Sequence, residues 1–180
     1  VNEMATEQSF YALVAAQRFN DGKSALYRIA DVQTGQNNLA AAVKKLNIVS
    51  KGKTFTDILN HENKKPIEAL AERGIISGKS ETEFAPDANV TRAEFAAILV
   101  RALGVEKLNG NAFSDVRKSD WFIKDVNTAY RYGIVKGVSE TEFNPNGFVT
   151  REEAAVQIYR VLSALNMKNA ESKTAIDNID

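Results

Sequence analysis

Two arginines in this sequence stand where their charge needs an explanation. Thr91-Arg92-Ala93-Glu94 and Thr150-Arg151-Glu152-Glu153 both have the form of a capping box. In that motif the threonine oxygen accepts from the amide three residues on, and the glutamate reaches back to the threonine amide. Each arginine then lies in the first helical turn, where the helix dipole is positive and a cation costs about 0.3–1 kcal/mol. A second interaction must offset that cost at both places.

Two kinds of partner could offset the cost. One is a carboxylate of a neighbouring copy of the same sequence unit. The other is an external anion, held jointly by the guanidinium and by free amides at the helix start. The two are compatible, because Asp57 or Asp115 could hold an arginine in place beside a ligand. These aspartates could equally cap turns or helices.

Trp121 is the third kind of candidate. It opens a predicted helix, and the face of an indole ring suits the C–H face of a sugar. It could instead be a half-buried residue that fixes the entry of the chain into that helix. The other copy of the unit has Glu62 at the corresponding place, so grooves beside the two copies cannot be equal.

The composition argues against several classes of function. The chain has 180 residues, 23 basic and 23 acidic side chains, no cysteine and one histidine, His61. Charge balance gives no bulk attraction to nucleic acid, and no apolar run reaches the roughly 20 residues that span a bilayer. No nucleophile, base and orienting group occur together. We therefore expect no catalysis, no metal and no cofactor.

The elements that must position these residues come from an internal repeat. Residues 74–94 return about 59 residues later as 133–153, with the same order of glycine, Phe-x-Pro and Thr-Arg-x-Glu elements. A unit this short cannot bury its apolar face alone, so neighbouring copies must pack on each other. We predict an N-terminal helical segment and linker over 1–53, a first repeat over 54–108, a second over 109–168, and the truncated start of a third over 169–180.

Each repeat is predicted to be a helix, a loop and a second helix, and the chain to be all-α. Gly74 and Gly133 suit a left-handed end to the first helix. The second helices begin at the two threonines. Their expected buried residues are Phe95, Ile98, Leu99, Ala102 and Leu103 in one copy and Ala155, Ile158, Val161, Leu162 and Leu165 in the other. Before the repeats, helices are expected over 3–19 and 39–46.

With these elements assigned, the repeats resemble the surface-layer homology (SLH) module of cell-surface proteins from Gram-positive-type bacteria. The resemblance covers about residues 55–165. It rests on Phe-x-Asp followed by Ile or Val, then Gly-Ile, a further glycine, Phe-x-Pro and Thr-Arg-x-Glu, all present in both copies. It implies tandem repeats packed in a pseudo-symmetric helical bundle. Copy one departs from the pattern because it lacks the tryptophan.

The resemblance also implies a function. SLH modules anchor exported proteins to secondary cell-wall polysaccharide, often through a pyruvylated sugar, at the cell surface outside the cell. The site residues that it implies, in grooves between repeats, are Arg92, Arg151, Thr91, Thr150, Trp121, Asp57, Asp115, Gly78 and Gly137. The expected partner is that polysaccharide, with no membrane insertion. Alternatives are an assembly module that self-associates through the incomplete third repeat, or an accessory fragment of a wall-attached enzyme whose catalytic domain lies elsewhere.

A second resemblance concerns the N-terminal segment. Residues 1–33 are similar to the last helices of prenyltransferase-like α/α-toroid domains, through Tyr11 to Ala15, Arg18-Phe19 and Leu26-Tyr27. The same residues are also compatible with a generic amphipathic helix.

Overall fold

The computed structural model describes residues 38–165. Contacts between residues divide the chain into two units, residues 1–33 and residues 34–180. Every described residue belongs to the second unit. The helix expected over 3–19, the toroid resemblance and the predicted third repeat therefore lie outside the described residues. Among the described helices, none is long and apolar enough to cross a membrane.

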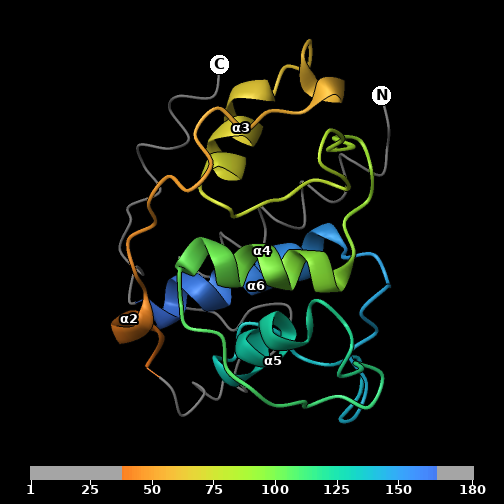
Figure 1. The fold of residues 1–180 in the computed structure, drawn as a ribbon. Coiled ribbons are helices and arrows are strands. Elements are labelled where there is room, and N and C mark those ends of the chain that lie inside the picture. Colours follow the sequence, from red (N-terminus) through yellow and green to blue (C-terminus); the bar gives the residue numbers. More distant parts are fainter. Residues whose placement is uncertain (1–37, 166–180) are drawn as a thin grey trace, which may run out of the picture. The chain divides into compact units, whose positions relative to one another are not determined.

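The described residues form helices joined by long loops (Figure 1). The elements are α2 (Leu39–Ala42), a short 3-10 helix η2 (Thr56–Ile58), α3 (Lys64–Glu72), α4 (Arg92–Leu103), α5 (Ile123–Arg131) and α6 (Arg151–Ala164). Over residues 38–165 no strand occurs, and one isolated bridge pairs Thr91 with Phe148. The predicted all-α class is confirmed.

Each repeat is a helix, a loop and a helix, as expected: α3 and α4 in repeat 1, α5 and α6 in repeat 2. The first helices end where Gly74 and Gly133 adopt positive φ, at 68° and 71°. Both predicted capping boxes are present, with Thr91 and Thr150 as N-caps of α4 and α6. The local sequence therefore sets where these helices begin and end.

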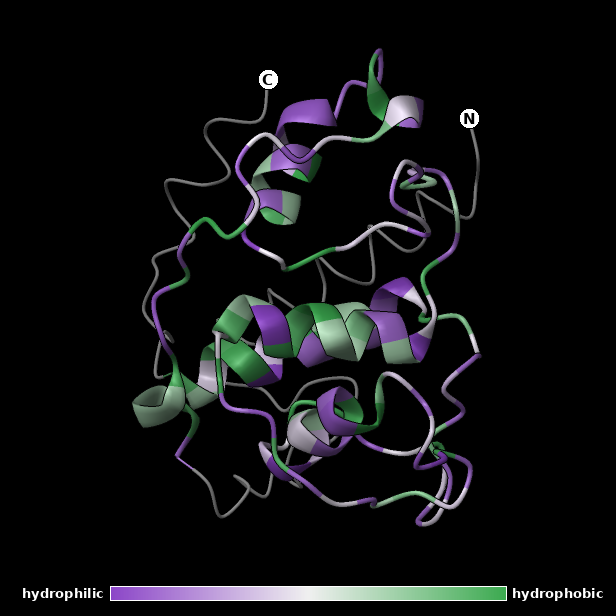
Figure 2. Cartoon of the chain, in the orientation of Figure 1, coloured by the Kyte–Doolittle hydropathy of each residue, from purple (hydrophilic) through white to green (hydrophobic). Residues whose placement is uncertain are grey.

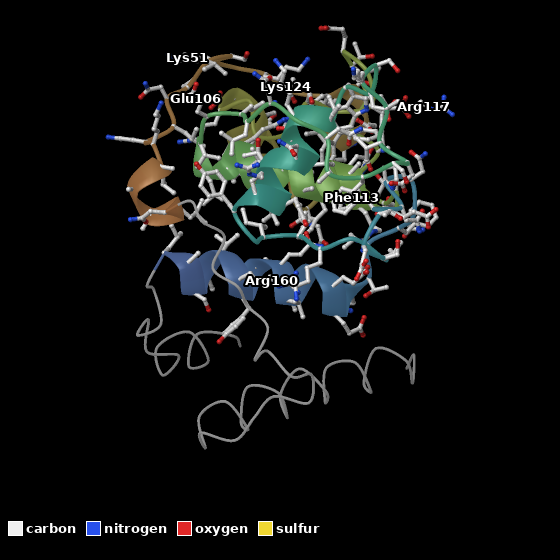
Figure 3. All side chains as sticks on the ribbon, turned by 90° about the horizontal axis from the view of Figure 1, so that it is seen from below. Lys51, Glu106, Phe113, Arg117, Lys124 and Arg160 are labelled. Atoms are coloured by element: carbon white, nitrogen blue, oxygen red, sulfur yellow. The ribbon has the colours of Figure 1, made fainter. Side chains whose placement is uncertain are left out.

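The core does not follow the repeat boundaries. The larger apolar cluster combines Ala96, Val100 and Leu103 of α4 with residues from repeat 2, among them Phe113 and Val126. α4, the second helix of repeat 1, packs on α5, the first helix of repeat 2. Figure 2 shows that apolar residues run along most of α4, and Figure 3 shows Phe113 toward the interior while Arg117 points outward at the rim. Repeat 2 is thus completed by a helix of repeat 1.

A smaller cluster holds repeat 1 together. It contains Phe55 and Ile58 at the start of the repeat and Ile67 and Ala71 of α3, with Ile98 of α4 packed against it. α4 therefore contacts two clusters at once. This explains a correction to the predicted stripe of α4: its buried residues are Arg92, Ala93, Ala96, Ala97, Val100 and Leu103, and Ala102 is exposed.

The predicted stripe of α6 is also wrong in part. Val161 is buried, but Ile158 and Leu162 are 46% and 41% exposed, and Ala155 is exposed as well. These residues correspond, 59 positions on, to Leu99, Leu103 and Ala96 of α4. In α4 the corresponding face is covered by repeat 2, whereas nothing in residues 38–165 covers it in α6.

One further prediction is wrong. The helix expected over 39–46 ends at Ala42. The next residue, Val43, has an extended backbone, and its amide donates the last hydrogen bond of the turn to the carbonyl of Leu39. Four residues cannot stabilise a helix by themselves, because nucleation is costly. Leu39 is buried in the larger cluster, and that tertiary contact is what holds this turn.

Two glycines allow the loops to close on aromatic rings. A Cβ at Gly78 would lie 2.4 Å from the ring of Phe55 and 2.7 Å from the carbonyl of Glu83. A Cβ at Gly137 would lie 2.4 Å and 2.5 Å from two loop carbonyls and 2.7 Å from the ring of Phe113. The space beside each glycine is filled by its own repeat.

This contact predicts an unequal effect of two alanine substitutions. Gly78 and Gly52 have nearly the same φ, 77° and 78°, but nothing lies within 4 Å of a Cβ at Gly52. Gly52→Ala is expected to lower the free energy of unfolding by about 1 kcal/mol through backbone strain alone. Gly78→Ala is expected to lower it by about 1–3 kcal/mol more, because the ring and loop must move. Urea unfolding of both variants measures the difference, and equal losses would contradict the packing described.

Candidate functional site: the seam between the two repeats

Arg92 is buried in repeat 2, although it belongs to repeat 1. It is 5% exposed, and its guanidinium donates from Nε to the carbonyl of Phe143 at 2.9 Å and from one terminal nitrogen to that of Lys136 at 3.0 Å. The other terminal nitrogen forms an ion pair with Glu153. The guanidinium also lies 5.0 Å from the centre of the Phe143 ring. These contacts offset the unfavourable position of a cation at a helix start.

Glu153 joins the starts of two helices. One of its carboxylate oxygens accepts from Arg92 and the other accepts from the amide of Thr150 at 3.0 Å, which closes the capping box of α6. We call the Arg92–Glu153 ion pair with its two carbonyl contacts the arginine clasp. Of the two partners that the sequence left open for Arg92, the structure shows the carboxylate of the neighbouring repeat.

The backbone at the start of α4 is engaged in the same way. The amide of Arg92 donates to the carbonyl of Gly147 at 2.8 Å, and that of Ala93 to the carbonyl of Pro145 at 3.1 Å. The amide of Glu94 is taken by the hydroxyl of Thr91. Helix-start amides bind anions only while they lack partners. At α4, repeat 2 occupies the first two of these amides and Thr91 occupies the third.

Arg151 is in a different state, although it has the same place in the Thr-Arg-x-Glu motif. It is exposed at the start of α6. Thr150 caps that helix by accepting from the amide of Glu153 at 3.2 Å. The two predicted arginine sites are therefore not equivalent: one lies inside the contact between repeats, and the other faces outward.

Asp57 and Asp115 hold loops. Asp115 accepts from the amides of Phe143 at 2.8 Å and Asn144 at 2.7 Å. Asp57 accepts from the corresponding amides of repeat 1, with Ala85 at 2.6 Å. In each repeat the second of these loop residues has a positive φ, 59° or 56°. Because the carbonyl of Phe143 accepts from Arg92, Asp115 also steadies one wall of the arginine clasp.

Trp121 stands at a second part of the contact between repeats, with a cation beside it. The indole is 58% exposed, and the guanidinium of Arg101 lies 5.5 Å from the centre of its ring. Phe122 packs edge-on against the indole at 5.3 Å and is itself buried. Arg101 comes from α4 and also contacts Ser77 of repeat 1, at 3.4 Å. An exposed aromatic face and a cation are thus brought together by two different repeats.

The carboxylate of Asp125 lies beside Arg101 and a second cation, Lys107. This carboxylate is fully buried; Lys107 lies 2.8 Å from one oxygen and 3.0 Å from the other, and only the second contact has hydrogen-bond geometry. Arg101 lies 3.8 Å from the second oxygen as well. Two cations thus share one carboxylate, which leaves one positive charge in excess. We call Trp121, Arg101, Lys107 and Asp125 the Trp121 corner.

Sequence reasoning missed Arg101, Lys107 and Asp125. One signal was available: Arg101 has a counterpart 59 residues on, Arg160, in the same turn of the second helix. Figure 3 shows Arg160 on α6, where it donates to the carbonyl of Ile134 at 3.3 Å. Lys107 and Asp125 have no such signal, because neither position is repeated.

The chemistry of the Trp121 corner follows from its indole ring and its guanidinium. An indole face gives a platform for a sugar ring, and a guanidinium with charge in excess over its neighbours binds a carboxylate through charge-assisted hydrogen bonds. Among the residues described, no group of three or more histidine or acidic side chains could hold a metal ion.

Comparison with known proteins connects this geometry to a family. The S-layer homology domain matches residues 54–96 and 112–155, which lie within the two predicted repeats. An exoglucanase, XynX, of Acetivibrio thermocellus is 36% identical over 76% of this chain and 13% of its own length. An endo-1,4-beta-xylanase A of Thermoanaerobacterium saccharolyticum is 40% identical over 67% of the chain and 10% of its own length. A surface layer protein of Brevibacillus choshinensis is 35% identical over 69% and 12%. The chain thus corresponds to about a tenth of these relatives.

The arginine clasp predicts that two equivalent substitutions differ in their effect on stability. Arg92→Ala leaves Glu153 and two carbonyls without their donor, so the free energy of unfolding is expected to fall by about 1–3 kcal/mol, a range that allows for the partial exposure of Glu153. Arg151→Ala removes an exposed side chain and is expected to change it by less than about 0.5 kcal/mol. Unfolding in urea measures the free energy of unfolding of both variants. Equal effects would show that the clasp contributes nothing.

Asp57 predicts a dependence of stability on pH. The hydrogen bond from the amide of Phe84 is the largest cause that holds the pKa of the Asp57 carboxyl below its ordinary value of 3.8. Because the folded-state pKa is the lower one, the stabilisation is fully present above the ordinary pKa and is lost as pH falls through the folded-state value. The stability gap between wild type and Asp57→Asn should therefore be larger at neutral pH than near pH 3, by urea unfolding.

A matched control for this measurement is Glu140→Gln, which removes an exposed carboxylate from the loop of repeat 2. Its gap to wild type should change less between the two pH values. If the Asp57→Asn gap stayed constant on acidification, the loop contact would not be electrostatic.

Proposed function

This chain belongs to the S-layer homology family, and from that premise we propose that its two repeats bind secondary cell-wall polysaccharide at the contact between them. Domains of this family are non-catalytic anchors of the bacterial cell wall, and the chain is a cell-surface protein. The proposal assigns no reaction to residues 38–165. The identity of the sugar and the residues that hold it are the finer part of the proposal.

The observation that carries the proposal is the Trp121 corner. It joins an exposed indole to a guanidinium from the other repeat, 5.5 Å away, with one positive charge in excess. A saccharide that bears a carboxylate, such as a pyruvate ketal, could lay its ring on Trp121 while its carboxylate meets Arg101. Lys107 is 42% exposed and could contact the same group.

The other predicted site residues support this site in different ways. We propose that Arg151, which is exposed, is a second contact for the polysaccharide at the start of α6. Arg92 and Thr91 act indirectly, by joining the repeats whose contact forms the Trp121 corner. Asp115 and Gly137 act through Arg92, because they fix the loop of repeat 2 that Arg92 contacts. Thr150 caps α6 as Thr91 caps α4. Asp57 and Gly78 hold the loop of repeat 1, as Asp115 and Gly137 hold the loop of repeat 2.

The test is binding of purified secondary cell-wall polysaccharide to the chain, by calorimetry or by co-sedimentation with cell walls. Trp121→Ala and Arg101→Gln are each expected to weaken binding about tenfold, or about 1.4 kcal/mol, because the first removes the proposed platform for the sugar ring and the second the proposed contact with the carboxylate. The control is Phe148→Ala, which removes another exposed aromatic of repeat 2, 63% exposed.

Mild acid treatment of the polysaccharide removes pyruvate ketals and provides a second arm. Loss of binding on that treatment supports a carboxylate ligand, and Arg101→Gln should then bind treated and untreated polysaccharide alike. If both corner variants bind as well as wild type, the site is elsewhere, and unchanged binding after acid treatment would restrict the proposal to a neutral sugar.

A further inference from the structure

The chain between the two repeats is tied to α5. We call residues 105–112, which follow α4 and contain no helix, the inter-repeat linker. The carbonyls of Leu108 and Asn109 both accept from the side-chain amide of Asn127, at 3.1 Å and 3.0 Å, and the amide of Leu108 donates to the hydroxyl of Thr128 at 2.8 Å. Asn127 and Thr128 are buried. The linker is therefore held up to Asn109 by two fixed side chains of repeat 2.

Gly110 follows directly and has little room. A Cβ at this position would lie 3.1 Å from Nδ2 and 3.2 Å from Oδ1 of Asn127. The next residue, Asn111, donates from its side chain to the carbonyl of Val116 at 2.6 Å. Gly110 thus lies between two anchored segments, and a longer backbone at this point does not fit unless one of them moves.

Asn109 and Gly110 also form a reactive pair. Asparagine is thermolabile because the amide nitrogen of the next residue can attack its side-chain carbonyl, and glycine, which has no Cβ, obstructs that attack least. Both residues are exposed. Over residues 38–165 the amide of Gly110 has no hydrogen-bond acceptor, so its nitrogen is available to water and base.

The sequence contains one other Asn-Gly pair, Asn146-Gly147. Asn146 is exposed as well. The amide of Gly147, however, donates to the carbonyl of Asn144 at 3.1 Å, and the carbonyl of Gly147 accepts from the amide of Arg92 at 2.8 Å. The nitrogen that would attack Asn146 is thus engaged, and the start of α4 holds the turn. The same motif is protected in one place and open in the other.

From this contrast we propose that Asn109 is a site of spontaneous deamidation, which converts it to aspartate or isoaspartate. The Gly110 nitrogen gives its proton to base and forms a bond to Cγ of Asn109, the bond from Cγ to the side-chain nitrogen breaks, and ammonia leaves. Water then opens the resulting succinimide at either of its carbonyls. The sum consumes a water and releases an ammonia, and it needs no oxidant, reductant or enzyme.

The two products change the linker differently. Opening at Cγ gives aspartate, which adds a negative charge and leaves the backbone as it was. Opening at the main-chain carbonyl gives isoaspartate, in which the chain runs through the side-chain carbon and gains a methylene before Gly110. The carbonyl that accepted from Asn127 then becomes a carboxylate. Because the linker is anchored on both sides of Gly110, isoaspartate must displace it from Asn127 or from Val116.

The displacement has a consequence for the Trp121 corner. Lys107, two residues before Asn109, contacts the buried carboxylate of Asp125 there. We therefore expect isoaspartate at position 109 to weaken binding of the polysaccharide. This consequence rests on the function proposed above, whereas the modification and the displacement of the linker do not.

Peptide mapping by mass spectrometry tests the modification site. The folded chain is incubated in mildly alkaline buffer, and the acidic products at positions 109 and 146 are measured over time. Asn109 is expected to be modified at least about fivefold faster than Asn146, because attack at Asn146 must first break the hydrogen bond of the Gly147 amide. In the chain unfolded by guanidinium the two rates should become similar, since neither amide is then engaged.

Matched variants isolate the linker. Asn109→Gln lengthens the side chain, which disfavours ring closure, and should stop the acidic product at this position from accumulating. Asn146→Gln is the control and should leave the rate at Asn109 unchanged. The isoaspartate form, separated from wild type by chromatography, should unfold at a lower urea concentration and bind the polysaccharide about threefold or more weakly. Asn109→Asp carries the charge without the longer backbone and should lose less stability.

Either of two results overturns the modification site: equal or faster modification of Asn146 in the folded chain, or an unmodified Asn109 in the folded chain under conditions that modify the unfolded one. An isoaspartate form as stable as the unmodified chain would overturn the displacement of the linker. Failure of the unmodified chain to bind the polysaccharide would count against the proposed function, and the rates measured at the two asparagines would be unaffected by it.

Discussion

The burial of one guanidinium organises this molecule. Arg92 belongs to repeat 1, but its side chain is buried in repeat 2. Three of its N–H groups donate there, to the carbonyls of Phe143 and Lys136 and to the carboxylate of Glu153. A charged group can be buried only when it is paired and hydrogen-bonded, so the position of every partner is constrained. Because Glu153 also closes the capping box of α6, a single ion pair fixes the starts of two helices relative to each other.

Sharing of α4 follows from the same constraint. A repeat of about 59 residues has too little apolar surface for an independent core, and here the second helix of repeat 1 is buried in the larger cluster of repeat 2. The contact between repeats is therefore part of the core. Arg101 and Trp121 meet across this contact, one from each repeat, so their positions relative to each other depend on the shared core.

The two repeats are alike in sequence but differ in what they lack. Repeat 2 has the tryptophan and depends on an external arginine; repeat 1 has Glu62 in place of the tryptophan and pairs Glu94, the counterpart of Glu153, with its own Lys79. The two repeats therefore expose different groups at corresponding positions.

The sequence by itself determined the local features: the two repeats, the capping boxes at Thr91 and Thr150, the glycines that end α3 and α5, and the all-α class. These depend on residues within a few positions of one another, and such short-range rules are strong. Tertiary structure alone decided that Arg92 is buried while Arg151 is exposed, that Ile158 and Leu162 lie outside, and that Arg101 stands beside Trp121. Those outcomes depend on which neighbour covers each face, and residues at the same place in the Thr-Arg-x-Glu motif have different neighbours in the two repeats.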